Sequence, residues 1–286
     1  MEQVFADLHL ARRLELAEAR ANANFVEARA EVSPQTGAEW IEIEGAYAMF
    51  DGPESPCTQT FGLGMREDVT DDQLEKLESF FDRHGAPVFH EVCPLADLST
   101  PHLLCMRGYE PFEFTSILFL PLVKQPSRSA SERIRVREIG PDEREQWAQL
   151  VARGWSEHPE LAGVILDLAR VTSYRSGGSD FVAELDGRPI ATGSVSIVDG
   201  VVLLAGASTI PEARKLGAQN ALLSARLKYG AEAACDMAMM GALPGSSSQR
   251  NAERNGFRIA YTRIKWQQVS FRASPPGRVE ESPSSR

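Results

Sequence analysis

A short stretch in the second half of the chain combines residue types that bind phosphate groups. It reads Ala207-Ser-Thr-Ile-Pro-Glu-Ala-Arg-Lys-Leu-Gly-Ala-Gln-Asn-Ala-Leu-Leu223, so a strand-like run ends near a proline and Gly217 opens a helical pattern. Glycine lets a backbone approach a ligand without a Cβ in the way, and the first amides of a helix have no partner within it. The helix dipole and the cations Arg214 and Lys215 add positive potential, so the pattern predicts a phosphate cradle. The same spacing also fits an ordinary strand–turn–helix unit with solvated basic residues.

A second segment lies further along the chain and reads Pro244-Gly-Ser-Ser-Ser-Gln-Arg-Asn-Ala-Glu-Arg-Asn-Gly-Phe257. Ser246 is placed as an N-cap, because its hydroxyl can accept a hydrogen bond from an early helix amide. Asn255-Gly256 is placed to end the helix, because glycine adopts the left-handed conformation that such an end requires.

Three residues could move protons, but each has an ordinary structural explanation. Glu184 lies on a strand just before a turn and is typical of a strand-end carboxylate. Tyr261 follows the Gly-Phe pair and is typical of a packed aromatic, and His158 precedes a proline in a loop and is typical of a surface histidine. We therefore assign no catalytic residue from the sequence.

The elements that position these residues follow from hydrophobic periodicity. In the second half we expect helices near 147–154, 161–168, 217–233 and 246–254, and strands at 134–139, 181–185, 190–198, 201–208, 235–243 and 258–269. Asp186-Gly187 and Asp199-Gly200 predict tight hairpin turns, because both central residues of such turns need positive φ. The pattern describes one mixed α/β domain.

The first half resembles a weakened copy of the same plan. We expect a helix over Phe5–Ala30, strands at 39–50, 57–65 and 87–92, a short helix at 103–107, and a helix at 71–83 whose Thr70 and Gln73 form a capping box. Arg107-Gly-Tyr parallels Asn255-Gly-Phe, and a long apolar strand follows each. An internal duplication explains these parallels, and two unrelated α/β domains remain the alternative. Asp71 and Asp72 would repel a pyrophosphate, so only the second half is expected to hold an anion.

A polar segment at residues 124–132 separates the halves, which gives domains 1–123 and 133–270 and a disordered tail at 271–286.

The 286 residues are 43% hydrophobic and 24% charged, which is globular composition. The net charge of −10 argues against nucleic acid as a partner. We expect no membrane span, no secretory signal and a cytoplasmic protein. Its four scattered cysteines lack metal-ligand spacing, so we expect them to be reduced and mostly buried, and we expect no metal.

The segment Pro211-x-x-Arg214-Lys-Leu-Gly217-Ala-Gln219 resembles the pyrophosphate-binding motif of the GNAT superfamily of N-acetyltransferases, Arg/Gln-x-x-Gly-x-Gly/Ala. The segment 244–257 resembles the later helix of that family, which ends in Gly-Phe and carries an asparagine near the cofactor. The match covers about residues 133–268. The chain is also similar to tandem members whose first copy is degenerate. The resemblance implies an α/β fold of two GNAT-like domains, each a mixed, mostly antiparallel central sheet flanked by helices.

The resemblance implies acetyl-CoA as co-substrate and assigns it binding residues. Backbone groups of three strand residues should hold the pantetheine arm, and turn amides should cradle the pyrophosphate. Asn251 should contact the pantetheine near the thioester, although its type and place also suit a solvated helix face. The implied binding residues are Ala207, Ser208, Thr209, Arg214, Lys215, Leu216, Gly217, Ala218, Gln219 and Asn251.

Two positions depart from the family pattern. Gln219 replaces the last small residue of the motif, but its backbone amide remains available. Ala252 stands where many members carry a tyrosine that protonates the departing thiolate, and alanine cannot donate a proton. An acid must then come from elsewhere or from solvent.

The resemblance implies direct transfer of acetyl from acetyl-CoA to a primary amine of a small molecule or peptide. The acceptor cannot be read from the residues. The alternative is a non-catalytic acyl-CoA-binding or sensor protein, which the absence of the tyrosine favours. A further alternative makes the first half a protein-interaction or dimerisation module and confines catalysis to the second half. A homodimer is one expected assembly.

Overall fold

The structure is a computed structural model that describes residues 4–122 and 133–269. The separating segment expected at 124–132 and the tail expected at 271–286 therefore lie outside the described residues. No helix in the described ranges is long and apolar enough to cross a membrane.

The first half contains three α-helices and five strands among its described residues. In chain order these are α1 (Leu8–Val32), β1 (Glu39–Ile43), β2 (Ala46–Phe50), β3 (Gln59–Phe61), α2 (Asp71–Arg83), β4 (Phe89–Val92), α3 (Thr100–Met106) and β5 (Tyr109–Pro121), with a short 3₁₀ turn at Pro34–Thr36.

The second half contains four α-helices and six strands among its described residues. They are β6 (Ile134–Glu138), α4 (Arg144–Gly154), α5 (Ala162–Thr172), β7 (Gly178–Leu185), β8 (Arg188–Val198), β9 (Val201–Thr209), α6 (Ala218–Glu232), β10 (Met237–Ala242), α7 (Ser247–Arg254) and β11 (Arg258–Gln268), with 3₁₀ turns at Pro141–Glu143, Pro159–Leu161 and Pro211–Ala213.

All of these strands join one sheet in the order β1-β2-β3-β4-β11-β5-β10-β9-β8-β7-β6. The predicted class is confirmed, since the protein is mixed α/β and its sheet is mostly antiparallel. The strands of both halves nevertheless form one continuous sheet. In its middle the two halves exchange their last strands: β5 lies between β10 and β11, and β11 lies between β4 and β5.

The pairing pattern is symmetric about the central β5–β11 pair. On one side β3 and β4 are parallel and β4 pairs antiparallel with β11. On the other side β9 and β10 are parallel and β10 pairs antiparallel with β5. Each half thus repeats the same sequence of pairings and completes it with a strand from the other half.

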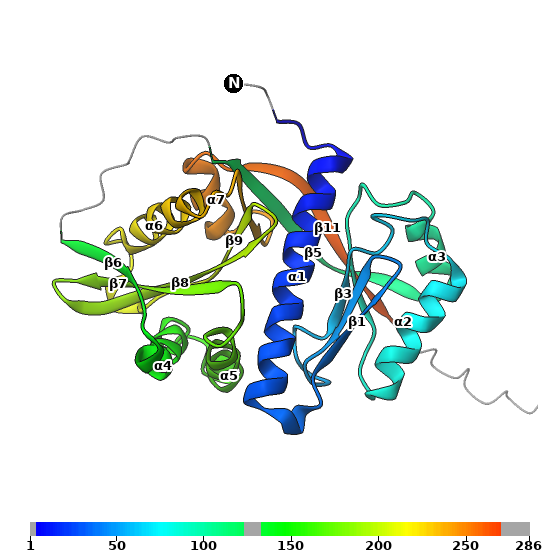
Figure 1. The fold of residues 1–286 in the computed structure, drawn as a ribbon, viewed down its shortest axis with the longest axis horizontal. Coiled ribbons are helices and arrows are strands. Elements are labelled where there is room, and N and C mark those ends of the chain that lie inside the picture. The colour runs from blue at the N-terminus through cyan, green and yellow to red at the C-terminus, as the bar shows by residue number, and fades with distance from the viewer. Residues whose placement is uncertain (1–3, 123–132, 270–286) are drawn as a thin grey trace, which may run out of the picture.

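The helices cover both faces of this sheet (Figure 1). On the second half, α6 and α7 lie on one face and α4 and α5 on the other. Helix α1 packs against β1, β2 and β3 of its own half and against β8 and β9 of the other. The largest core accordingly mixes the halves, with Leu14 of α1, Phe119 of β5, Leu203 of β9 and Met239 of β10 in one cluster.

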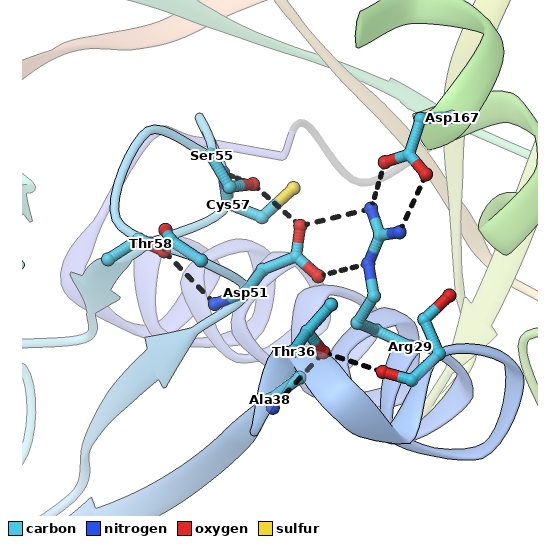
Figure 2. A network of polar contacts seen from close by, with 10 residues as sticks. Arg29, Thr36, Ala38, Asp51, Ser55, Cys57, Thr58 and Asp167 are labelled. Atoms are coloured by element: carbon cyan, nitrogen blue, oxygen red, sulfur yellow. Dashed lines mark hydrogen bonds and ion pairs between the residues drawn. The ribbon is translucent and has the colours of Figure 1, made fainter. Parts of the chain in front are cut away.

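Buried ion pairs also join the halves. Arg29 of α1 donates to Asp51, which follows β2, and to Asp167 of α5 (Figure 2), with Nε–Oδ1 and Nη2–Oδ2 distances of 2.7 and 2.5 Å. Arg263 of β11 donates through Nε to Glu91 of β4 and through Nη1 to Glu15 of α1, at 2.9 and 3.3 Å. Two buried arginines, Arg29 and Arg263, therefore contribute ion pairs to the contact between the halves, although the Asp167 side chain is more than half exposed.

The predicted hairpin turns are confirmed, because each depends on the backbone angle φ of two neighbouring residues. Asp186, Asp199 and the glycines after them all have positive φ, as tight hairpin turns require. The strand expected at 39–50 was wrong as one element: it is the β1–β2 hairpin, which turns at Glu44-Gly45. The expected capping box is half formed, because Thr70 accepts from the Gln73 amide while the Gln73 side chain donates to Ile43 O instead.

Candidate functional site

The site begins where two parallel strands separate. β9 and β10 are paired only between Val201–Leu203 and Met237–Met239. Beyond these residues β9 follows β8 to Thr209, while β10 follows β5 to Ala242. The strands must diverge, because each stays with its other neighbour. Residues 205–207 are consequently exposed although they lie within a central strand.

A β-bulge shapes the diverging part of β9. The register with β8 shifts between the pairs Thr192↔Ser208 and Ser194↔Ala205, so that two residues of β9 oppose one of β8. Gly206 lies in the bulge with φ +59°, and a Cβ there would stand 2.9 Å from Ser194 Oγ. The position therefore requires glycine. The bulge turns backbone groups away from the ladder and into the opening between the strands.

Two connected cavities occupy this opening. The outer cleft has a volume of about 690 Å³ and the inner recess about 150 Å³. They share Ala207, Gln219, Ser248 and Asn251. The outer cleft is also lined by Gly154, Trp155, Glu157, His158, Ser208, Thr209, Ala213, Arg214, Lys215, Gly217, Ala218, Asn220, Ser247 and Arg254. The inner recess is also lined by Leu204, Ala205, Gly206, Leu223, Arg226, Met240, Gly241 and Ala252.

The outer cleft ends on the N-terminus of α6. Gly217, the N-cap residue, has φ +94°, and no side chain caps the helix. Within the described residues the first α6 amide with a protein partner is that of Ala221, which donates to Gly217 O at 3.1 Å. The amides of residues 215–220 are thus left for another acceptor, and the helix dipole makes their surroundings positive. The helices α1, α2 and α7 are capped by the side chains of Asp7, Thr70 and Ser246, whereas α3, α4 and α5 share with α6 the lack of a side-chain cap.

The basic residues of the motif divide between two tasks. The Arg214 guanidinium bonds to Glu157 and donates to Gly154 O at 3.2 Å, so it joins the turn to the end of α4. Lys215 has φ +64° and lines the outer cleft. The Arg214 side chain therefore forms part of the wall of the outer cleft. It stabilises the turn before α6, and the backbone amides of that turn face the outer cleft.

Gln219 takes part in the site through its side chain as well as its amide. Its Nε2 donates to Ser208 O at 3.1 Å and to Thr209 Oγ1 at 2.7 Å. The Ser208 carbonyl, expected from the resemblance to hold the pantetheine arm, is therefore already bonded. Among the expected strand residues, Ala207 has the most open backbone. Leu216 is half exposed on the turn and does not line either cavity.

Helix α7 forms the opposite wall. Asn251 lines both cavities. Ala252 is buried and lines the inner recess.

The inner recess contains a buried arginine that the sequence analysis did not single out. Arg226 of α6 is 4% exposed and donates to the carbonyls of Leu222, Ser194 and Ala205 at 3.1 to 3.3 Å. Burial lowers the pKa of Arg226 to about 10, so it remains a cation at neutral pH. The sequence held one weak signal for it, because it lies one turn after Leu222 on the apolar face of the helix, but a charged residue there is read more safely as exposed.

A buried carboxylate–hydroxyl pair, also missed, lies behind the bulge. Ser194 Oγ donates to Asp180 Oδ1 at 2.7 Å, and Arg175 Nη1 donates to the same oxygen at 3.1 Å. Burial raises the pKa of the Asp180 carboxyl, and Arg175 opposes this shift. A Cβ at Gly206 would stand 2.9 Å from Ser194 Oγ, so the pair lies directly behind the bulge, although neither residue lines the two cavities.

The proton-transfer candidates from the sequence are not gathered at the site. Glu184 accepts from Arg137 Nε at 2.9 Å near the start of β6. The Tyr261 hydroxyl donates to Glu15 in the core between the halves, at 2.7 Å. His158 lies at the mouth of the outer cleft with a mostly exposed ring.

The corresponding helix N-terminus of the first half, that of α2, is not free in the way that the N-terminus of α6 is. The N-terminus of α2 is capped by Thr70 and carries Asp71 and Asp72 in its first turn. Gly62, just past β3, approaches Gly45 so closely that a Cβ would meet its carbonyl oxygen at 2.9 Å. Within the described ranges no three His, Cys, Asp or Glu side chains are grouped to hold a metal, and the four cysteines are free, one of them exposed.

Solved structures share this fold. A GCN5-related N-acetyltransferase from Kribbella flavida matches with a TM-score of 0.62 and 15% identity over 86% of this chain and 95% of that one. A tandem GNAT protein from the clavulanic acid biosynthesis pathway matches with a TM-score of 0.54 and 14% identity over 78% of this chain and 77% of that one. A GCN5-related N-acetyltransferase from Sphaerobacter thermophilus matches with a TM-score of 0.53 and 14% identity over 88% and 91%.

No protein-family model matches the sequence, and no curated protein matches it. At such low identities the structural likeness establishes the fold. The chain has the fold of the GNAT acetyltransferases, and the expectation drawn from the 211–219 and 244–257 segments is confirmed at that level.

Proposed function

We propose that the chain is an acyl-CoA-dependent N-acyltransferase that moves an acetyl or related short acyl group to a primary amine. The observation that carries this proposal is the uncapped N-terminus of α6, which opens onto a cleft leading to exposed backbone between β9 and β10. An uncapped helix N-terminus binds phosphate, and the cleft continues far enough to hold an extended arm. The fold supports the same function.

The proposed cofactor position follows from this geometry. The free amides of residues 215–220 would accept the pyrophosphate, with Lys215 adding charge. The pantetheine arm would follow the open backbone at Ala207 and pass Asn251, which leaves the thioester in the inner recess. The Gln219 side chain would either remain on Ser208 and narrow the passage or turn aside for the arm.

The proposed chemistry is a direct transfer in which the amine nitrogen attacks the thioester carbon. A carbon–nitrogen bond forms, the carbon–sulfur bond breaks, and the sulfur leaves as a thiolate with the pair of electrons. An exposed amide at the bulge around Gly206 would polarise the carbonyl. The attacking nitrogen must lose a proton, and Ser194 could accept it while passing its own proton to Asp180. With Ala252 in the recess, solvent would protonate the leaving thiolate.

Binding of CoA tests the first part of the proposal. The variant Lys215→Glu places a negative charge in the outer cleft, and we expect it to weaken CoA binding by about tenfold or more in isothermal titration calorimetry. Lys228→Glu, on the exposed face of α6, is the matched control and should change the affinity less than about twofold. Failure of the unmodified protein to bind CoA, or equal effects of both variants, would rule the site out.

The proposed proton route has its own matched pair. Ser194 and Ser196 lie on the same face of β8, and both hydroxyls belong to the Arg175–Asp180 cluster, but only Ser194 adjoins the bulge. Ser194→Ala should lower kcat by about 100-fold with little change in the KM for acyl-CoA, whereas Ser196→Ala should retain kcat. Equal kcat values for the two variants would exclude the route.

A non-catalytic acyl-CoA-binding or sensor protein is the second candidate. One observation favours it: among the described residues that line the inner recess there is no carboxylate, histidine, tyrosine or cysteine. Thiol release from acyl-CoA, measured against a library of amines, separates the candidates. An enzyme accelerates release with at least one amine, whereas a sensor binds CoA tightly and releases thiol with none.

We further propose that the halves are duplicated domains and that the first has lost its ligand site. The symmetric strand pairings support the duplication, and the Thr70 cap with its acidic first turn supports the loss. The first half would then serve the second structurally, by supplying β5, or mediate dimerisation.

A further inference from the structure

The buried arginine of the inner recess differs from other buried arginines of the molecule. Arg29, Arg226 and Arg263 are the arginines classed as buried within residues 4–122 and 133–269. Arg29 and Arg263 each form ion pairs with at least two carboxylates. Arg226 has none within 4.0 Å among the described residues, and burial is the one cause of its lowered pKa. Its positive charge is therefore not neutralised by the protein.

Backbone carbonyls provide hydrogen-bond partners for only part of the Arg226 guanidinium. Nε and Nη1 donate to three backbone oxygens, two of which belong to Ser194 and Ala205, the pair of residues that borders the bulge. Nη2 donates none of the hydrogen bonds found among the described residues. Gly193 leaves room for the guanidinium, since a Cβ there would stand 2.9 Å from Arg226 Cζ. Backbone dipoles orient the group, but a buried cation without a counter-charge is costly, so an anion would stabilise it.

The position of the recess says which part of a ligand would reach Arg226. The recess lies at the inner end of the cleft, beyond the residues that the two cavities share. A CoA thioester held by its pyrophosphate at α6 would place its acyl group there. The recess volume of about 150 Å³ is several times the roughly 30 Å³ of one water molecule. This leaves space for a chain longer than a methyl group.

We propose that the recess selects an acyl group that ends in a carboxylate, so that the preferred donor is a short dicarboxylic monothioester of the malonyl or succinyl type. This inference rests on the proposed function and specifies its donor. Arg226 would bind the terminal carboxylate and thereby hold the thioester carbon at the bulge. The transferred group keeps its carboxylate unchanged: the nitrogen–carbon bond forms, the carbon–sulfur bond breaks, and an amide with a free carboxylate is released beside CoA. Arg226 would repel a cationic amine acceptor. The anion that binds Arg226 is therefore expected to come from the acyl donor and not from the acceptor.

Calorimetric titration of the full chain with CoA, acetyl-CoA, malonyl-CoA and succinyl-CoA tests the proposal. We expect malonyl-CoA or succinyl-CoA to bind at least about tenfold more tightly than acetyl-CoA, as a hydrogen-bonded charge pair warrants. Arg226→Met should abolish this preference while changing the acetyl-CoA dissociation constant less than about threefold. Arg226→Lys should retain part of the preference. Lys228→Met removes a cation from the exposed face of the same helix and should leave the preference intact.

The other possible results of these titrations each lead to one conclusion about the inference. If acetyl-CoA binds as tightly as both dicarboxylic thioesters, the inference is overturned while the proposed function stands. If no CoA species binds, both fall. If Arg226→Met weakens all CoA species equally, Arg226 only supports the bulge, and the inference is again overturned. Should Arg226→Met fail to fold, the comparison of donors on the unmodified protein still decides.

Discussion

Separating the two halves of the chain tests the exchange of strands between them. A fragment of residues 133–286 lacks β5, which lies between β10 and β11 in the sheet. Within the described sheet β11 pairs only with β4 and β5, and both belong to the first half. The fragment would leave β11 without a partner and expose the edge of β10. We therefore predict that residues 133–286 do not form a stable monomer.

The size of the effect can be worked out from β5 alone. Its residues Ile117, Leu118, Phe119 and Leu120 are each 5% exposed or less. Burying one such side chain contributes about 1.5–3 kcal/mol, so the group contributes roughly 6–12 kcal/mol. A whole domain is stable by only about 5–15 kcal/mol. Removing β5 is thus expected to lower the free energy of unfolding of the 133–286 fragment by most or all of its value. The loss of α1 from the core would lower it further.

The assay compares four samples: residues 133–286 alone, residues 1–132 alone, the two co-expressed, and full-length protein cut at a protease site introduced within residues 124–132 after folding. Size-exclusion chromatography with light scattering gives the assembly, and urea unfolding followed by circular dichroism gives the stability. We expect each fragment alone to aggregate or to unfold without cooperativity. The co-expressed fragments and the cut protein should both form one-to-one particles that bind CoA.

A monomeric 133–286 fragment that unfolds cooperatively and binds CoA like the full chain would refute the reasoning. It would show that β11 and β10 need nothing from the first half. Dissociation of the cut protein on dilution would refute it equally, because strands buried in the middle of one sheet should not separate under native conditions.

Two further predictions concern the bulge and the core between the halves. Gly206→Ala must place a Cβ at φ +59° and 2.9 Å from a serine hydroxyl, so we expect urea unfolding to show a loss of about 1–3 kcal/mol and CoA binding to weaken. Burial raises the pKa of Glu15 to about 7 from a usual value of 4.5, so the folded state holds this proton more tightly than the unfolded state. Stability should therefore fall by roughly 3 kcal/mol as pH rises from about 4.5 to 7, and Glu15→Gln should remove that fall.

Each of these predictions has a control. Gly37 also has positive φ, but nothing stands within 4 Å of a Cβ there, so Gly37→Ala should show the conformational cost alone and leave CoA binding unchanged. Equal losses for Gly37→Ala and Gly206→Ala would show that the bulge imposes no steric limit. For Glu15, parallel stability profiles of the variant and the unmodified protein between pH 4.5 and 8 would show that the buried carboxyl is not the titrating group.

The features that the sequence predicted well depend on a few neighbouring residues. The Asp-Gly turns, the Ser246 cap and Gly256 at the end of α7 require only a local backbone angle or one side-chain hydrogen bond. The turn at residues 214–217 belongs to this class, because glycine and a nearby proline decide its path. The Gln73 side chain shows the limit, since it found a tertiary partner in Ile43 that no local rule could indicate.

The residues that were missed act over longer distances. Arg226 looks like a solvated cation in the sequence, and its partners, the carbonyls of Ser194 and Ala205, lie on strands far from it in the chain. Asp180 becomes a partner of Ser194 only through the β7–β8 register. Both cases require knowing which face of an element is buried at a particular point, and a charged residue on a mostly apolar face is read more safely as exposed.

The exchange of strands is the least predictable feature and the one that matters most for the site. β5 and β11 each follow a short helix and a glycine and each carry an apolar pattern, so the sequence does not say in which half either is inserted. Yet β5 supports the wall that carries Asn251, since α7 packs on β5 and Ser116 Oγ donates to Gln249 Oε1 at 3.4 Å. In the first half the N-terminus of α2 is capped by Thr70, but this half supplies the strand against which the cleft of the second half is built. The boundary that the sequence places at residues 124–132 therefore separates two parts of the chain, but both parts are needed to build the site.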